Sequence, residues 1–233
     1  MSQAKKVFTR MCLNNWGGID HKVLEFHEYV NLFSGKSGSG KSTVMDAIQV
    51  ILYGSFSPSF LNKAADDAKN RRSVLSYLRG EQKDGSANRK DCDFCSVIAL
   101  EIEDTGTHII TCIGIAFEVR KSDSEIKKFV YFSHSGKMPE SEYLTEQGVC
   151  YSNQEIKKLV SARTKSDDNR GKGEVNRIYG SKEAYLGTLY DVILGYIDQN
   201  RFITMEKSAI ALKMTNGTGQ FIRDYMFPKS DSG

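Results

Sequence analysis

A glycine-rich run near the N-terminus has the residue types and spacing that suit the binding of a triphosphate. The run is Gly35-Lys36-Ser37-Gly38-Ser39-Gly40-Lys41-Ser42, which fits the pattern G-x-x-x-x-G-K-[ST]. Glycines let the backbone wrap closely with its N–H groups pointing inward, which makes an anion-binding nest. We expect residues 35–40 to form this cradle, with Lys41 on the β- and γ-phosphates and Ser42 on Mg²⁺.

Such a loop needs a strand before it and a helix after it. Tyr29–Phe33 is a short apolar stretch that predicts the strand, and apolar residues at helical spacing predict a helix over Val44–Leu52 that ends near Gly54. The positive end of this helix would face the phosphates. Thr43 is expected to reach the α-phosphate, and Asp46, one turn into the helix, to form a structural hydrogen bond.

Hydrolysis would require a second acidic element, an apolar strand that ends in Asp. The candidate is Val192–Asp198, followed by Gln199 where a Glu would usually polarise water. The apolar residues before Asp198 keep helical spacing, so we interpret the stretch as a helix end. Gln199 is a candidate to approach Mg²⁺ or the attacking water, and no residue is assigned as a certain catalyst.

The rest of the chain divides into strand-like and helix-like stretches. Asn14–Gly18 is expected to be a turn, Glu81–Asp91 an exposed mobile loop, and His134–Lys137 a turn that closes a strand. Ser152 and Glu155 have capping-box spacing. The expected strands are 7–13, 21–26, 96–103, 108–119 and 128–133, and the expected helices lie within 63–78, 152–162, 181–194, 205–214 and 219–227.

Composition excludes several classes of protein. Apolar residues make up 39% and charged residues 26%, as in an ordinary globular protein, and no apolar run is long enough to span a membrane. The N-terminus lacks an apolar signal core, so we expect a cytoplasmic protein without a membrane partner. The net charge of +3 means that DNA contact would depend on local basic patches. Five cysteines are interpreted as reduced thiols, since Cys92 and Cys95 have no second ligand pair for zinc.

The order of several segments resembles the N-terminal half of an SMC-type ATPase head, closest to bacterial MukB and Wadjet JetC-like proteins. The resemblance covers most of the chain, although only the phosphate loop is highly specific. The segments are 15–19 (Asn-Trp-Gly-Gly-Ile), the loop with 42–49 (Ser-Thr-Val-Met-Asp-Ala-Ile-Gln), 62–65 (Asn-Lys-Ala-Ala), 76–80 (Ser-Tyr-Leu-Arg-Gly) and 221–228 (Phe-Ile-Arg-Asp-Tyr-Met-Phe-Pro).

The resemblance implies an α/β fold of the P-loop NTPase class. The ABC-ATPase-like head lobe over residues 1–233 would contain a mixed sheet, an antiparallel β subregion and flanking helices. The coiled coil, the signature motif and the Asp-Glu pair of such proteins are missing from the sequence. We therefore expect an N-terminal lobe that does not turn over ATP alone.

The family mechanism implies ATP and Mg²⁺ as cofactors, and a second head, DNA and accessory subunits as partners. Two heads would sandwich two ATP molecules and move DNA, either in plasmid restriction or in chromosome partition. Asn15 and Trp16 are candidates to flank the nucleotide, although a tryptophan at a turn is more typical of a core. Arg71, Arg72 and Arg79 are candidates for DNA or ATP contact, against the alternative of a solvated helix face.

Two other functions remain open from the sequence. A self-contained P-loop kinase or GTPase would use Asp198 as its magnesium ligand, although an Asn-Lys-x-Asp run for guanine is absent. A nucleotide-binding interaction module that never hydrolyses its ligand would need only the phosphate loop.

Overall fold

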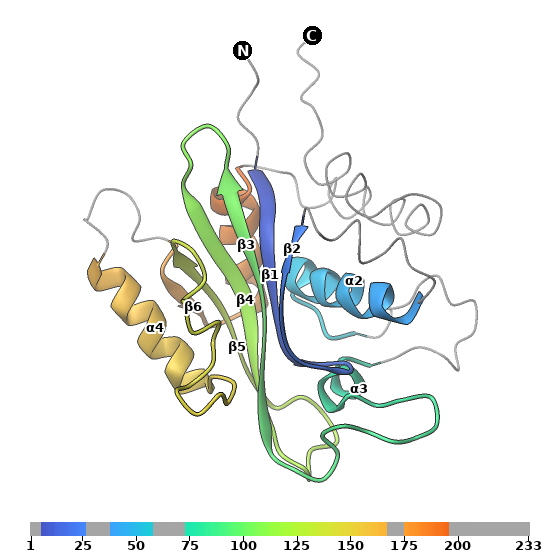
Figure 1. The fold of residues 1–233 in the computed structure, drawn as a ribbon. Helices are drawn as coiled ribbons and strands as arrows, with labels where there is room; N and C mark the ends of the chain where they lie inside the picture. The colour runs from blue at the N-terminus through green and yellow to red at the C-terminus, as the bar shows by residue number, and fades with distance from the viewer. Residues whose placement is uncertain (1–5, 27–37, 58–72, 167–174, 196–233) are drawn as a thin grey trace.

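The computed structural model describes residues 6–26, 38–57, 73–166 and 175–195. A six-stranded sheet forms the middle layer, with helix α2 on one side and helix α4 on the other (Figure 1). The elements in chain order are β1 (Lys6–Trp16), β2 (Ile19–Glu25), α2 (Gly38–Tyr53), α3 (Val74–Arg79), β3 (Phe94–Asp104), β4 (Ile110–Val119), β5 (Lys128–Ser135), α4 (Asn153–Ser166), β6 (Arg177–Tyr179), α5 (Lys182–Thr188) and the π-helix η3 (Leu189–Ile193).

The strand order is β2-β1-β3-β4-β5-β6, and every pairing in the described part of the chain is antiparallel. This differs from the mixed sheet expected for the lobe. One physical reason lies in the connections. β1–β2 and β3–β4 are joined by short turns and β4–β5 by an eight-residue connection, and each returns the chain beside the strand it has just left. The segment Tyr29–Phe33, expected to lead into the phosphate loop, lies outside the described residues.

Side-chain alternation along the strands builds two separate apolar cores. On β3, Ile98 and Leu100 belong to the core with α2, whereas Val97 and Ala99 belong to the core with α4. Because successive strand residues point to opposite faces, both faces of the sheet are covered and its central strands are largely buried. The two helices therefore do not share a core.

Several local predictions are confirmed. Helix α2 ends at Tyr53, and Gly54 follows it in the left-handed conformation, with φ of 62°. Before α4, the Ser152 hydroxyl accepts a hydrogen bond from the Glu155 amide, and the Glu155 carboxylate accepts one from the Ser152 amide. Ser181 caps α5 as expected.

Other boundaries were wrong. The first turn is confined to Gly17 and Gly18, because β1 continues through Trp16. Strand β5 includes His134 and Ser135, both of which were expected in a turn, because their backbone continues the ladder with β4. The strand β6 was not predicted, since three residues carry no readable alternation. The predicted helices over 205–214 and 219–227 lie outside the described residues.

Of the helices that the structure describes, none is both long enough and apolar enough to cross a membrane.

Candidate functional site

Helix α2 begins at Gly38, inside the glycine-rich run. Gly35, Lys36 and Ser37 lie outside the described residues, and for residues 38–42 the structure describes the helical backbone alone. The first N–H groups of a helix have no partner within the helix, and they carry its positive end. The backbone start at Gly38 is therefore the arrangement that the motif requires, while the contacts of Lys41 and Ser42 stay predictions.

Trp16 holds the first turns of α2. Its indole Nε1 donates a hydrogen bond to the Thr43 carbonyl at 2.8 Å, and its ring stacks on Tyr77 with centroids 4.8 Å apart. The Tyr77 hydroxyl donates in turn to the Asp46 carboxylate, which gives Asp46 the structural hydrogen bond that the sequence predicted. Trp16 is fully buried, and its described contacts are with α2 and Tyr77, while a place for Asn15 and Trp16 beside the nucleotide stays a prediction.

Asn15 explains how Trp16 reaches α2. Leu13 packs in the α2 core and Asn14 faces the other side, so strict alternation would send Trp16 away from α2. Asn15 adopts a left-handed backbone with φ of 54°, a conformation that asparagine tolerates better than most residues. Its side-chain amide donates to the Cys95 carbonyl at 2.8 Å. Asn15 thus interrupts the alternation and is tied to β3.

The turn between β1 and β2 also approaches α2 closely. Gly17 has φ of 58°, and a Cβ there would lie 2.7 Å from Cγ2 of Thr43. Its amide donates to the Tyr77 carbonyl at 2.7 Å. Only glycine fits this backbone and this spacing without a shift of Thr43 or the turn.

Arg89 fixes this turn from the other side, and nothing in the sequence pattern indicated it. The guanidinium donates to the carbonyls of Gly17 at 2.6 Å and Leu78 at 2.7 Å, and it pairs with Asp20 at 3.2 Å. Burial lowers the pKa of Arg89, and the Asp20 carboxylate opposes that shift. Arg89 is buried, so the segment 81–91, expected to be mobile, is anchored at this residue.

Three tyrosines hold the other end of α2. The last carbonyls of a helix have no partner within the helix. Tyr185 donates to the Ile51 carbonyl at 2.6 Å, Tyr190 to that of Leu52 at 2.5 Å, and Tyr131 to that of Gly54 at 2.5 Å. We call these three residues the tyrosine clamp. Sequence reasoning missed them, because a tyrosine in an apolar stretch does not reveal its hydrogen-bond partner.

The remaining candidates fall into two groups. Arg79 donates to the carbonyls of Arg120, Lys121 and Asp123 in the turn after β4, so the structure uses it to hold that turn. Arg71, Arg72, Asp198 and Gln199 lie outside the described residues.

No group of three or more His, Cys, Asp and Glu side chains in the described ranges is placed to hold a metal ion. Cys92 is exposed and Cys95 is half-buried, and neither forms a disulfide. Burial raises the pKa of Cys95 to about 11, which keeps its thiol protonated near neutral pH.

One of two comparisons with known proteins gives the residues matched, and they include the glycine-rich run. Residues 8–68 match the family model described as the P-loop containing region of AAA domain. The SbcC component of the nuclease SbcCD from Staphylococcus haemolyticus (strain JCSC1435) is 34% identical to this chain over 74 residues, which is 30% of this chain and 6% of that protein. The chain therefore spans a small part of that relative's length. Taken with the run at residues 35–42, the two matches support a P-loop ATPase region of the SMC and SbcC type.

Proposed function

We propose that this chain binds ATP with Mg²⁺ through Gly35–Ser42, as the nucleotide-binding lobe of an SMC-like ATPase head. The observation that carries the proposal is the start of α2 inside the motif, on a helix fixed at both ends. A helix held in this way presents its first N–H groups in a constant direction, which favours binding of a phosphate anion. The match of residues 8–68 to a P-loop region supports the same assignment.

Each residue of the motif has a proposed role. The backbone of residues 35–40 surrounds the phosphates, Lys41 neutralises the β- and γ-phosphates, and Ser42 binds Mg²⁺. Thr43 lies next in the chain, with its carbonyl held by Trp16, and is proposed to contact the α-phosphate. Hydrolysis would follow once a C-terminal lobe and a second head complete the site, with Gln199 near the metal or the water.

The similarity to a nuclease component extends the proposal to partners. The relative's name describes one subunit of a nuclease, and we propose that this chain likewise works with a partner subunit on DNA. A homodimer of heads, plasmid restriction and chromosome partition belong to the same proposal. Addition of a C-terminal lobe should raise ATP turnover from the baseline of this chain, and turnover by the chain alone that is lost in Asp198→Ala would instead favour a self-contained NTPase.

ATP binding by the purified chain tests the central claim. Titration calorimetry with ATP and Mg²⁺ should give saturable binding that Lys41→Ala weakens at least about 100-fold, since it removes a charge-assisted phosphate contact. The matched control is Lys83→Ala, because Lys83 is an exposed lysine on the segment between α3 and β3. Equal affinities of the wild type and Lys41→Ala would refute the assignment.

A further inference from the structure

A pocket lies at one end of the sheet, beside the C-terminal end of α4. It has a volume of about 440 Å³ and lies where the start of β4, the end of β5 and the C-terminal end of α4 meet. Its charged or titratable lining residues are Lys137, Arg163 and His108, and among the lining residues that the structure describes none is acidic. Thr111, Ser135 and Ser166 complete the polar lining, but the Ser135 hydroxyl donates to Asn176 and the Ser166 hydroxyl to the Arg163 carbonyl. The donors suited to an oxyanion are therefore the cationic side chains.

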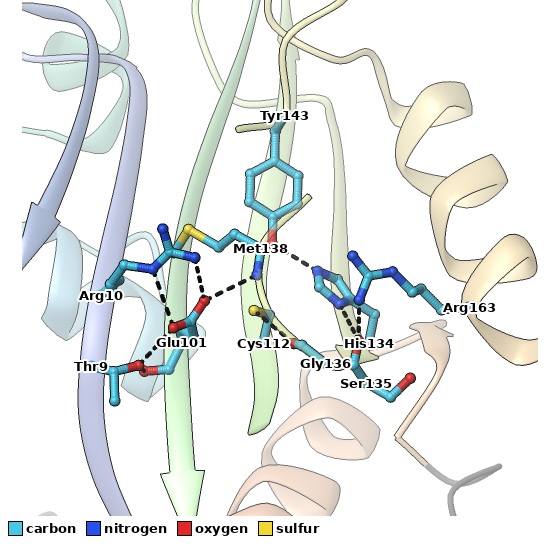
Figure 2. Close-up of polar contacts among 10 residues, drawn as sticks. All are labelled: Thr9, Arg10, Glu101, Cys112, His134, Ser135, Gly136, Met138, Tyr143 and Arg163. Atoms are coloured by element: carbon cyan, nitrogen blue, oxygen red, sulfur yellow. Dashed lines mark hydrogen bonds and ion pairs between the residues drawn. The ribbon is translucent and has the colours of Figure 1, made fainter. Parts of the chain in front are cut away.

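Arg163 is positioned to bind a ligand in this pocket. Its Nη1 donates to the Ser135 carbonyl at 2.7 Å, which fixes the guanidinium beside Gly136 (Figure 2). Among the described residues Arg163 makes no ion pair, and only its Nη1 has a hydrogen-bond acceptor there. A held guanidinium with two remaining donors loses little entropy when it binds an oxyanion.

Gly136 makes the space for this guanidinium. Its φ is 75°, and a Cβ at this position would lie 2.6 Å from Nη1 of Arg163. Any other residue would displace the arginine head or strain the turn after β5. The missing side chain at Gly136 therefore lets the Arg163 guanidinium lie against the backbone.

The pocket differs in charge from a neighbouring cleft. A larger cleft of about 830 Å³ shares Ile110 and Lys137 with this pocket, and it is lined by Glu25, Glu101, Glu103, Glu140 and Glu142. Near the pocket itself, Glu103 lies 3.8 Å from the exposed His108. The C-terminal carbonyls of α4 also oppose an anion, but Arg163 and Lys165 in the last turn offset them. A negative ligand is therefore favoured in the pocket beside Arg163 over the glutamate-lined cleft on the other side of Lys137.

We propose that the pocket between Gly136, Lys137 and Arg163 binds the phosphate group of a phosphate ester. The Arg163 guanidinium, held in place by the Ser135 carbonyl, suits a tetrahedral oxyanion. Lys137 adds an exposed ammonium group. The ester could belong to a DNA backbone or to a free nucleotide, since the pocket reads only the phosphate. The site goes beyond the proposed nucleotide site on α2, and it does not depend on Lys41.

The test separates the two sources and keeps the α2 site out of the measurement. All arms use the full chain in a Lys41→Ala background, where the α2 site is disabled. Fluorescence anisotropy with a duplex oligonucleotide measures DNA binding over a salt series, and calorimetry measures binding of ATP and of inorganic phosphate. Arg163→Gln and Lys137→Gln are compared with Lys83→Gln, which removes an exposed charge far from the pocket in sequence.

We expect Arg163→Gln to weaken binding of the cognate phosphate about tenfold. If DNA is the source, each of the two variants should also reduce the slope of log affinity against log salt by about 1. If a free nucleotide is the source, ATP or inorganic phosphate binding should weaken in the same variants while DNA binding does not change. Lys137 is exposed, and its side chain makes no ion pair with the residues that the structure describes, so Lys137→Gln decides the matter if Arg163→Gln is unstable. If Arg163→Gln and Lys137→Gln both bind duplex DNA, ATP and inorganic phosphate with the same affinities as Lys83→Gln, the proposal is overturned.

Discussion

On the α2 face of the sheet, four aromatic side chains donate to backbone carbonyls of one helix or of the residue after it, whereas on the α4 face polar contacts join separate strands to a long connection. Trp16 and the tyrosine clamp all reach carbonyls of α2 or of Gly54 just after it. On the other face, Arg10, Thr9 and the Met138 amide all bind the Glu101 carboxylate (Figure 2). The first arrangement fixes the axis of a helix, and the second joins separate strands and a connection.

The α4 face also holds the long connection between β5 and α4. The His134 ring bonds to the Tyr143 hydroxyl at 2.8 Å, and the Asn14 amide donates to the Glu142 carbonyl at 3.0 Å. Glu142 and Tyr143 both have left-handed backbones, with φ of 55° and 57°. Strained residues of this kind persist only where surrounding contacts over-determine them. The polar network therefore helps to keep this connection on the sheet.

Alanine substitution of the central aromatic residue on each face gives the largest expected effect. Trp16 and Tyr143 are both fully buried. Each Trp16→Ala and Tyr143→Ala variant should lose about 3–5 kcal/mol of unfolding free energy, measured by urea denaturation. At a temperature where both are folded, only Trp16→Ala should also weaken ATP binding.

Trp16→Phe serves as the milder variant, because it keeps an aromatic ring and removes the donor to Thr43. The comparison between the faces fails if Tyr143→Ala weakens ATP binding as much as Trp16→Ala does.

Acid should weaken the α4 face through His134. Burial lowers the pKa of His134 to about 4, and the charge of Arg163 acts in the same direction. The unfolded chain gains this proton below about pH 6.5 and the folded chain only near pH 4, so stability falls as pH decreases across this interval. The cost at pH 5 is about 2 kcal/mol, from about 1.4 kcal/mol for each pH unit below 6.5.

His134→Gln removes the titrating group and should flatten this dependence. Urea unfolding at pH 7.5 and pH 5 for both proteins gives the difference, and the contributions of other titrating groups cancel in it. Parallel pH profiles for the wild type and the variant would show that His134 is not responsible.

The tyrosine clamp offers the smallest effects and the finest test. Tyr185→Phe and Tyr190→Phe each remove one hydroxyl and leave one α2 carbonyl unpaired, so each should cost about 1 kcal/mol of unfolding free energy. Thermal or urea unfolding measures it. The matched control is Tyr151→Phe, whose hydroxyl bonds to exposed Ser141 at 3.0 Å. A cost for Tyr151→Phe equal to that of the clamp variants would mean that the α2 contacts have no special weight.

Local sequence patterns were sufficient for much of the fold. The hairpin of β3 and β4, the capping box before α4 and the end of α2 at Gly54 were all readable, because each depends on residues close together in the chain. The position of the phosphate loop was equally readable, since its spacing is contiguous.

The sequence predictions were wrong at residues whose conformation depends on contacts with distant parts of the chain. His134 and Ser135 look like turn residues, yet pairing with Cys112 and Thr111 on β4 keeps them in a strand. Arg89 sits in a hydrophilic segment, yet three partners up to 72 residues away bury it. Propensity describes a residue in its local segment, and tertiary contacts override it when they satisfy its polar groups.

The sequence by itself predicted a phosphate-binding loop followed by a helix, because eight adjacent residues and the apolar pattern after them carry that information. The helix is confirmed as α2, and its side chains from Thr43 to Tyr53 are all buried. Only the tertiary structure decided how this helix is held. Trp16 reaches α2 because the strand alternation is interrupted at Asn15, two tyrosines bind its last carbonyls, and a third binds the Gly54 carbonyl just after it. Those contacts join residues 27 to 138 positions apart. No spacing rule reports such pairs, because they form when the sheet brings distant segments together.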